Sequence, residues 1–144
     1  MVGLAETTFL VVLIGVGATA VMDLWLLILK RLHVPTLNFA FIGRWVGHIF
    51  QGKWFHEGML RVEPIKGELR IGWLTHYAIG VAFAALLVSV FGVGWMDNPT
   101  FLPAISVGMA TVIAPLFIMQ PAMDAGIASS KTASPTLFAY HYAR

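Results

Sequence analysis

Four polar side chains interrupt the apolar segments of this sequence and are of types that can do chemistry: Asp23, His76, Gln120 and Asp124. A carboxylate inside a membrane span costs about 2.5–3.5 kcal/mol, so Asp23 requires a partner or a bound proton. Imidazole exchanges protons near neutral pH, and imidazole with carboxylate suits zinc, iron or manganese. These residues form a candidate intramembrane polar site. It can act as a proton relay or a divalent-metal site, or it can be a buried Asp–His hydrogen bond that only fixes how helices pack.

Two further polar residues, Arg44 and His48, lie between the first two apolar segments and extend the candidate site from the membrane interface. Ligands to a metal, if the protein binds one, would come from Asp23, His48, His76 and Asp124. No HxxxH, ExxH or HExxH pair is present, so no motif supports a metal and the cofactor stays unknown. Haem held by two histidines is disfavoured, because only His76 is clearly inside an apolar segment.

Three segments, 7–29, 71–91 and 101–122, must position these side chains, and each is long and apolar enough to cross a bilayer as a helix. The chain is 58% hydrophobic and only 11% charged, whereas soluble domains are about 25% charged. Because the chain reverses direction between the first two spans, Asp23 and His76 both fall about 8 Å inside one membrane boundary, at about 1.5 Å per helical residue. We therefore predict an all-α integral membrane protein, a single domain over 1–144, with its polar side chains in one leaflet.

The distribution of basic residues predicts the orientation of these spans. All nine Lys and Arg residues lie either between the first two spans or after the third: Lys30, Arg31, Arg44, Lys53, Arg61, Lys66, Arg70, Lys131 and Arg144. Cytoplasmic loops are enriched in Lys and Arg. We expect the N-terminus outside, and the long loop and C-terminus in the cytoplasm.

The long loop is expected to hold an amphipathic helix over about 36–52. This helix should lie in the membrane interface without crossing the membrane. Apolar residues recur in it at helical spacing, and Arg44 and His48 share the opposite face. Residues 57–70 read as a solvated link. The tail, 125–144, is too short after Pro135 for another crossing.

Small residues spaced four apart predict how the spans pack. Gly15 and Thr19 form such a stripe on the first span, and Gly72, Gly80 and Ala84 form one on the second. Small residues let helix backbones approach closely in lipid. We expect these five residues to lie at helix–helix contacts.

Four strings carry a family resemblance: Gly17-Ala18-Thr19-Ala20-Val21-Met22-Asp23-Leu24-Trp25, Gly43-Arg44-Trp45-Val46-Gly47-His48, Gly72-Trp73-Leu74-Thr75-His76-Tyr77 and Met119-Gln120-Pro121. Together they resemble an uncharacterised family of small bacterial inner-membrane proteins, a domain of unknown function. The resemblance covers about residues 15–135. It implies a multi-pass inner-membrane protein with a fourth helix, which is shortened or missing in this chain, and it implies no activity.

Three functions are compatible with this sequence. The first is a non-enzymatic accessory subunit, because no nucleophile or phosphate-binding motif is present and little chain lies outside the spans. Its partners would be the lipid bilayer and other membrane helices or a second copy, and not nucleic acid. The second is a small carrier or a metal- or proton-handling protein built on Asp23, His76, Gln120 and Asp124. The third is an assembly or sensing factor that acts through loop residues 44–68.

Overall fold

The computed structural model describes residues 3–34 and 36–127, and every regular element in them is a helix. The helices are α1 (Leu4–Arg31), α2 (Phe39–Ile49), α3 (Glu68–Phe91), the short α4 (Gly94–Asp97) and α5 (Phe101–Ala114). A π-helical turn, η1 (Pro115–Met119), and α6 (Gln120–Ala122) continue α5. The all-α prediction is confirmed.

Three of these helices are long and apolar enough to cross a membrane. They are α1 with 28 residues, α3 with 24, and the 22-residue helix made by α5, η1 and α6, with mean hydropathies of 2.3, 1.9 and 2.1. The three predicted spans are thereby confirmed. The observed helices include a few polar residues at their ends, such as Lys30 and Glu68, because backbone hydrogen bonding continues past the apolar run.

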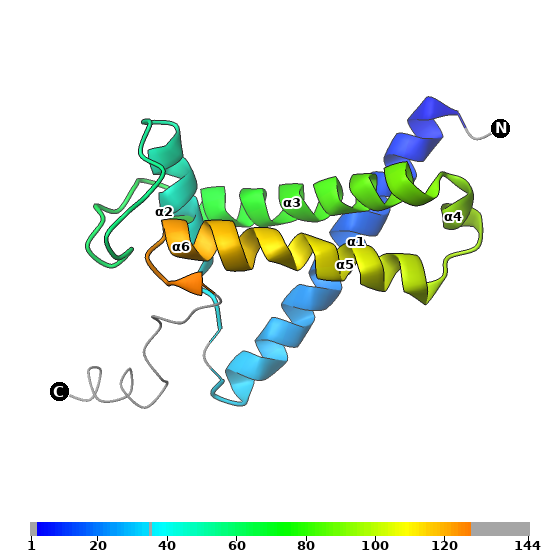
Figure 1. Cartoon of the computed structure of the whole chain (residues 1–144). Helices are drawn as coiled ribbons and strands as arrows, with labels where there is room; N and C mark the ends of the chain where they lie inside the picture. Colours follow the sequence, from blue (N-terminus) through cyan, green and yellow to red (C-terminus); the bar gives the residue numbers. More distant parts are fainter. Residues whose placement is uncertain (1–2, 35, 128–144) are drawn as a thin grey trace.

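Helix α3 is the centre of the arrangement (Figure 1). It packs against α1, α2 and α5. Figure 1 shows α5 running alongside α3 after the turn at α4, whereas α1 crosses α3 steeply. The short α2 lies across the end of α3 opposite to α4.

The crossing of α1 and α3 depends on small residues. A Cβ atom added to Gly15 would lie 2.5 Å from the Cα of Val81, and one added to Gly80 would clash with Oγ1 of Thr19. The Thr19 hydroxyl donates to the carbonyl of Gly15 at 2.7 Å, so it is satisfied within its own helix. The expected close approach of the two helices occurs at these residues.

Helix α2 meets α3 even more closely. A Cβ on Gly43 would clash with the carbonyl of Glu68, and one on Gly72 would clash with the carbonyl of Phe39. The side chain of Asn38 accepts a hydrogen bond from the Ala40 amide at 3.0 Å and so caps the start of α2. The helix therefore begins at Phe39 and ends at Ile49, a shorter range than the predicted 36–52.

The loop between α2 and α3 is folded onto α2. Arg44 and His48 are buried, with 7% and 8% of their surface exposed, and Met59 is buried beside them. Most of the predicted solvated link, 57–70, is exposed, including Arg61, Glu63 and Lys66. Three of its backbone carbonyls nevertheless lie within hydrogen-bonding distance of the polar side chains of α2. A charge pattern along a loop does not reveal such partners.

Two prolines shape the third span. Pro115 and Pro121 have no N–H to donate, and the helix widens into η1 at Pro115. The helix ends where the Ala125 amide donates to the Gln120 carbonyl and the Asp124 amide to the Pro121 carbonyl, with Asp124 at φ 60°. This is a Schellman-type end in which Asp124 takes the position usually held by glycine. Most of the predicted tail, 128–144, and with it the question of a shortened fourth helix, lies outside the described residues.

Candidate functional site

Asp23 of α1 forms a hydrogen-bonded centre with two consecutive residues of α3. The Nε2 atom of His76 lies 2.8 Å from Oδ1 of Asp23, and the Tyr77 hydroxyl donates to Oδ2 at 2.7 Å. Only 11% of the His76 side chain and 17% of the Asp23 side chain are exposed. Both carboxylate oxygens therefore have a partner within the apolar part of the molecule.

Tyr77 belongs to this centre but was not among the site residues predicted from the sequence. It follows His76 directly, and both side chains reach one carboxylate because it offers two oxygen atoms. Adjacent helical residues point about 100° apart, so spacing on α3 does not predict a shared partner. The sequence does show a Tyr hydroxyl in an apolar segment, and such a buried hydroxyl usually has a hydrogen-bond partner.

Aromatic rings hold the His76 imidazole in place. The ring of Phe39, at the start of α2, lies with its centroid 4.5 Å from the His76 centroid and also 4.5 Å from the Trp73 centroid. Tyr77 meets His76 edge-on at 5.6 Å. The centre is thus fixed by all three of α1, α2 and α3.

A cavity of about 910 Å³ lies beside this centre, between α1, the start of α2 and α3. Asp23 forms part of its wall, together with Lys30 and His33 from the end of α1. The remaining wall is mostly apolar and includes Phe39 and Trp73. Such a cavity suits water or a small amphiphilic molecule, with a carboxylate and an ammonium group available to orient it.

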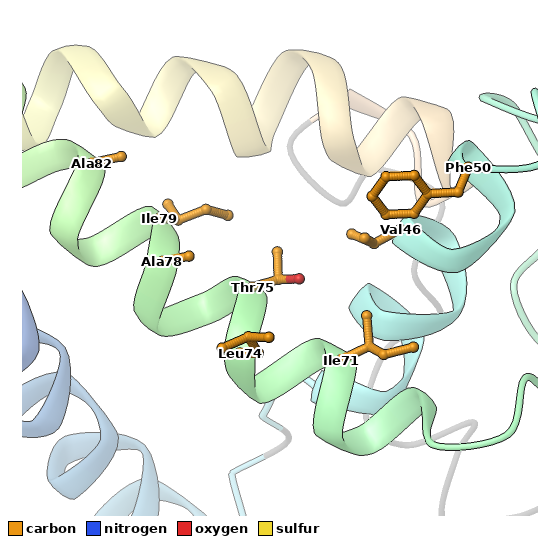
Figure 2. Close-up of a pocket in the computed structure, with 8 residues that line it drawn as sticks. All are labelled: Val46, Phe50, Ile71, Leu74, Thr75, Ala78, Ile79 and Ala82. Atoms are coloured by element: carbon orange, nitrogen blue, oxygen red, sulfur yellow. The ribbon is translucent and has the colours of Figure 1, made fainter.

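A second, more open groove of about 440 Å³ lies between α2 and α3 (Figure 2). Its lining is apolar apart from Thr75. Figure 2 shows Val46 of α2 and Phe50, the residue after α2, facing this groove, and Ile79 facing it from α3. Because it offers almost no polar group, the groove suits an acyl chain or an apolar side chain and supports no catalysis.

Arg44 is a structural centre for the loop. Its guanidinium forms a two-pronged ion pair with Glu68, at 2.8 and 2.9 Å, and donates to the carbonyls of Met59 and Val62 at 2.8 and 3.1 Å. Glu68 also accepts from the Ile65 amide at 3.1 Å. Hydrogen bonding to Glu68 raises the pKa of Arg44, against the opposite effect of burial. Arg44, which was expected to extend the candidate polar site, thus ties the loop to the start of α3.

His48 lies on α2 and faces the same folded loop, beside His56. The Nε2 atom of His48 is 3.1 Å from the Glu63 carbonyl oxygen, and the His48 and His56 ring centroids are 5.3 Å apart. The His56 amide donates to the Ala122 carbonyl at 3.0 Å, which joins this loop to the end of α6. Burial lowers the pKa of His56, and the nearby His48 and Lys53 lower it further.

The structure divides the predicted polar layer between two places. Asp23 and His76 are in contact between α1 and α3. Gln120 begins α6, and Oδ2 of Asp124 lies close to the place a Cβ of Gly58 would occupy, in the loop after α2. Within residues 3–34 and 36–127, no three His, Asp or Glu side chains are grouped so that they could hold a metal ion.

Comparison with known proteins gives one match. The model of a family described as "Protein of unknown function (DUF2938)" matches residues 12–142. No curated protein and no solved structure matches the chain. The resemblance predicted from four sequence strings is thereby confirmed.

Proposed function

We propose that this chain, which belongs to the DUF2938 family of proteins of unknown function, is a non-enzymatic accessory subunit whose helices pack against other helices in the membrane. The observation that carries the proposal is how little the helices cover one another. In the most apolar part of each span, 11%, 17% and 6% of the residues are buried inside the chain. Helix α5 contains no buried residue.

This exposure matters because lipid changes what holds helices together. Lipid tails are as apolar as leucine, so helices associate through close packing and hydrogen bonds. The chain gains such packing along α3, while large parts of α1 and α5 face outward. Contact with a further helix, from another protein or from a second copy, would supply the missing packing.

Two glycines mark outward faces where such a helix could approach. A Cβ atom added to Gly17 on α1, or to Gly108 on α5, would meet nothing within 4 Å. Glycine inside a helix costs roughly 0.5–1 kcal/mol relative to alanine. Neither glycine is required by packing within the described chain, so both fit a contact with another molecule.

The membrane and orientation form part of the proposal. We place the protein in a bacterial inner membrane, with the N-terminus outside and the long loop and C-terminus in the cytoplasm. The support is that every Lys and Arg lies within residues 30–70, from the end of α1 to the start of α3, or after the third span.

The test is native mass spectrometry of the protein extracted from its own membranes in mild detergent. We expect the wild-type chain to carry another subunit or a second copy, and we expect Gly17→Leu and Gly108→Leu to lose it. Ala110→Leu is the matched control, because Ala110 is exposed on α5 and lies about 200° around the helix from Gly108. A wild-type chain that is found alone would contradict the proposal.

A second function, proton handling, is favoured by the Asp23 centre. A carboxylate that accepts hydrogen bonds from an imidazole and a phenol, on the wall of a cavity, can take up and release a proton. In sealed vesicles with a pH dye inside, Asp23→Asn and His76→Ala should abolish proton movement. Ser89→Ala is the control, since that hydroxyl bonds only to Ala85 of its own helix and is exposed. Equal proton movement in the wild type and in all three variants would exclude this function.

A further inference from the structure

Two neighbouring histidines, His48 of α2 and His56 of the following loop, contain buried nitrogen atoms without partners. Within residues 3–34 and 36–127, Nδ1 of His48, both ring nitrogens of His56 and Oε1 of Gln120 have no hydrogen-bond partner. His48 is only 8% exposed. Buried polar atoms are nearly always satisfied by protein, water or an ion, so these atoms are places where water or an ion would bind.

The bond made by the other nitrogen of His48 shows what kind of occupant fits. Its Nε2 lies 3.1 Å from the Glu63 carbonyl, which can only accept a hydrogen bond, so Nε2 carries the hydrogen. In the neutral ring, Nδ1 is then a buried lone pair. Histidines that bind metals usually donate their other ring N–H to a carbonyl or carboxylate in this way.

His56 offers a second imidazole. Both of its ring nitrogens are buried without a hydrogen-bond partner, and a neutral imidazole keeps a lone pair on one of them. Its backbone is held by the hydrogen bond from its amide to Ala122, two residues beyond Gln120. Lone pairs without donors attract a cation.

The spacing of the two rings agrees with a shared ion. Their centroids are 5.3 Å apart and their planes meet at 59°. Two imidazoles on one tetrahedral zinc ion, with Zn–N distances of about 2.0–2.1 Å, have centroids about 5 Å apart.

We infer that His48 and His56 bind one divalent transition-metal ion of the zinc class, through Nδ1 of His48 and one ring nitrogen of His56. Water or an external ligand fills the remaining coordination positions. No third His, Asp or Glu completes the group within the described part of the chain. The site does not involve Asp23 and does not depend on the accessory role, so either can fail alone.

The experiment is a Co²⁺ titration of the purified, metal-stripped full chain in detergent, followed by visible ligand-field absorption, with Zn²⁺ as competitor. We expect one Co²⁺ per chain, displaced by Zn²⁺, and at least a tenfold loss of affinity in His48→Ala and in His56→Ala. His33→Ala is the control, because that side chain is exposed at the end of α1 and should leave binding unchanged. Circular dichroism at each titration point shows whether the variants keep their helices.

His48→Ala removes the hydrogen bond to Glu63 as well as the lone pair, so His56→Ala, which leaves that bond intact, decides the matter if His48→Ala does not fold. Absence of Co²⁺ binding by the folded wild-type chain would assign the unpartnered atoms to buried water and overturn the proposal. Unchanged affinity in folded His56→Ala would overturn it equally. In hydrogen exchange, Zn²⁺ should slow the amides of 53–58 in the wild type and not in His56→Ala.

Discussion

Arg44 shows how much one side chain contributes to this fold. Its four hydrogen bonds join α2, the loop and the start of α3, and it is 7% exposed. An arginine suits this position because its planar fork binds a carboxylate with two parallel bonds and still reaches carbonyls. Lysine has the charge without the fork.

We predict that Arg44→Lys lowers the free energy of unfolding by about 2–4 kcal/mol, because a partly buried carboxylate loses its matched partner. The carbonyls of Met59 and Val62 also lose their donors, so the amides of 59–65 should exchange faster with deuterium. Detergent-denaturant unfolding and hydrogen exchange measure the two effects. Lys53→Arg, at an exposed position in the same loop, is the control and should change neither. If Arg44→Lys had the same unfolding curve as the wild type, the ion pair between Arg44 and Glu68 would contribute nothing to the free energy of unfolding.

The sequence predicts part of the candidate site at this scale. Depth along the spans puts Asp23 and His76 at one level, and in the structure they are in contact. Depth is a single coordinate, however, and does not give the direction in which a side chain points around its helix. For that reason, depth alone could not show that Asp23 is in the hydrogen-bonded centre and that Asp124 is not. The backbone of Asp124 closes the end of α6 instead. The pairing of His48 with His56 was also hidden, since it depends on how the loop folds.

At the scale of elements, glycine decides how closely the helices approach. Gly43 and Gly72 allow the backbones of α2 and α3 to touch, and a Cβ at either position would clash with a carbonyl. Because the clash is with backbone, no side-chain rotation relieves it. Helix α2 would have to move, and with it Phe39, which packs on His76.

We therefore predict that Gly72→Ala destabilises the protein by about 1–3 kcal/mol, the usual cost of overpacking. Gly17→Ala is the matched control on α1, where a Cβ meets nothing within 4 Å. That substitution should be neutral or stabilise the helix by up to about 1 kcal/mol, because alanine favours helices over glycine. Thermal unfolding of both variants in the same detergent checks the difference. Equal melting temperatures for the two variants would show that α2 docks without this contact.

The helices themselves follow from simple properties of the chain. An apolar run of about 20 residues must become a helix in lipid, since its backbone has no other hydrogen-bond partners there, and α1, α3 and α5 through α6 agree with that rule. The loop obeys no such rule. Its shape depends on Arg44 and His48 binding carbonyls 15 to 18 residues away, and sequence periodicity carries no information about such pairs.

At the scale of the whole molecule, the charge distribution argues for one orientation. Residues 30–70, from the end of α1 to the start of α3, contain seven of the nine Lys and Arg residues, whereas the turn at α4 contains Asp97 and no basic residue. Positive loops stay in the cytoplasm because their transfer across the membrane is disfavoured. With α3 crossing between them, Lys53 and Asp97 must then face opposite sides.

The chain has no cysteine, so a single introduced thiol reports on one position without background. Both Asp97 and Lys53 are exposed. We predict that Asp97→Cys reacts with a membrane-impermeant maleimide in intact spheroplasts, whereas Lys53→Cys reacts only after the membrane is opened. Gly3→Cys, at the exposed start of α1, should behave like Asp97→Cys, since α1 and α3 together return the chain to the same side. If only Lys53→Cys were labelled in intact cells, the predicted orientation would be reversed. The loop between α2 and α3 and the His48–His56 pair would then lie outside.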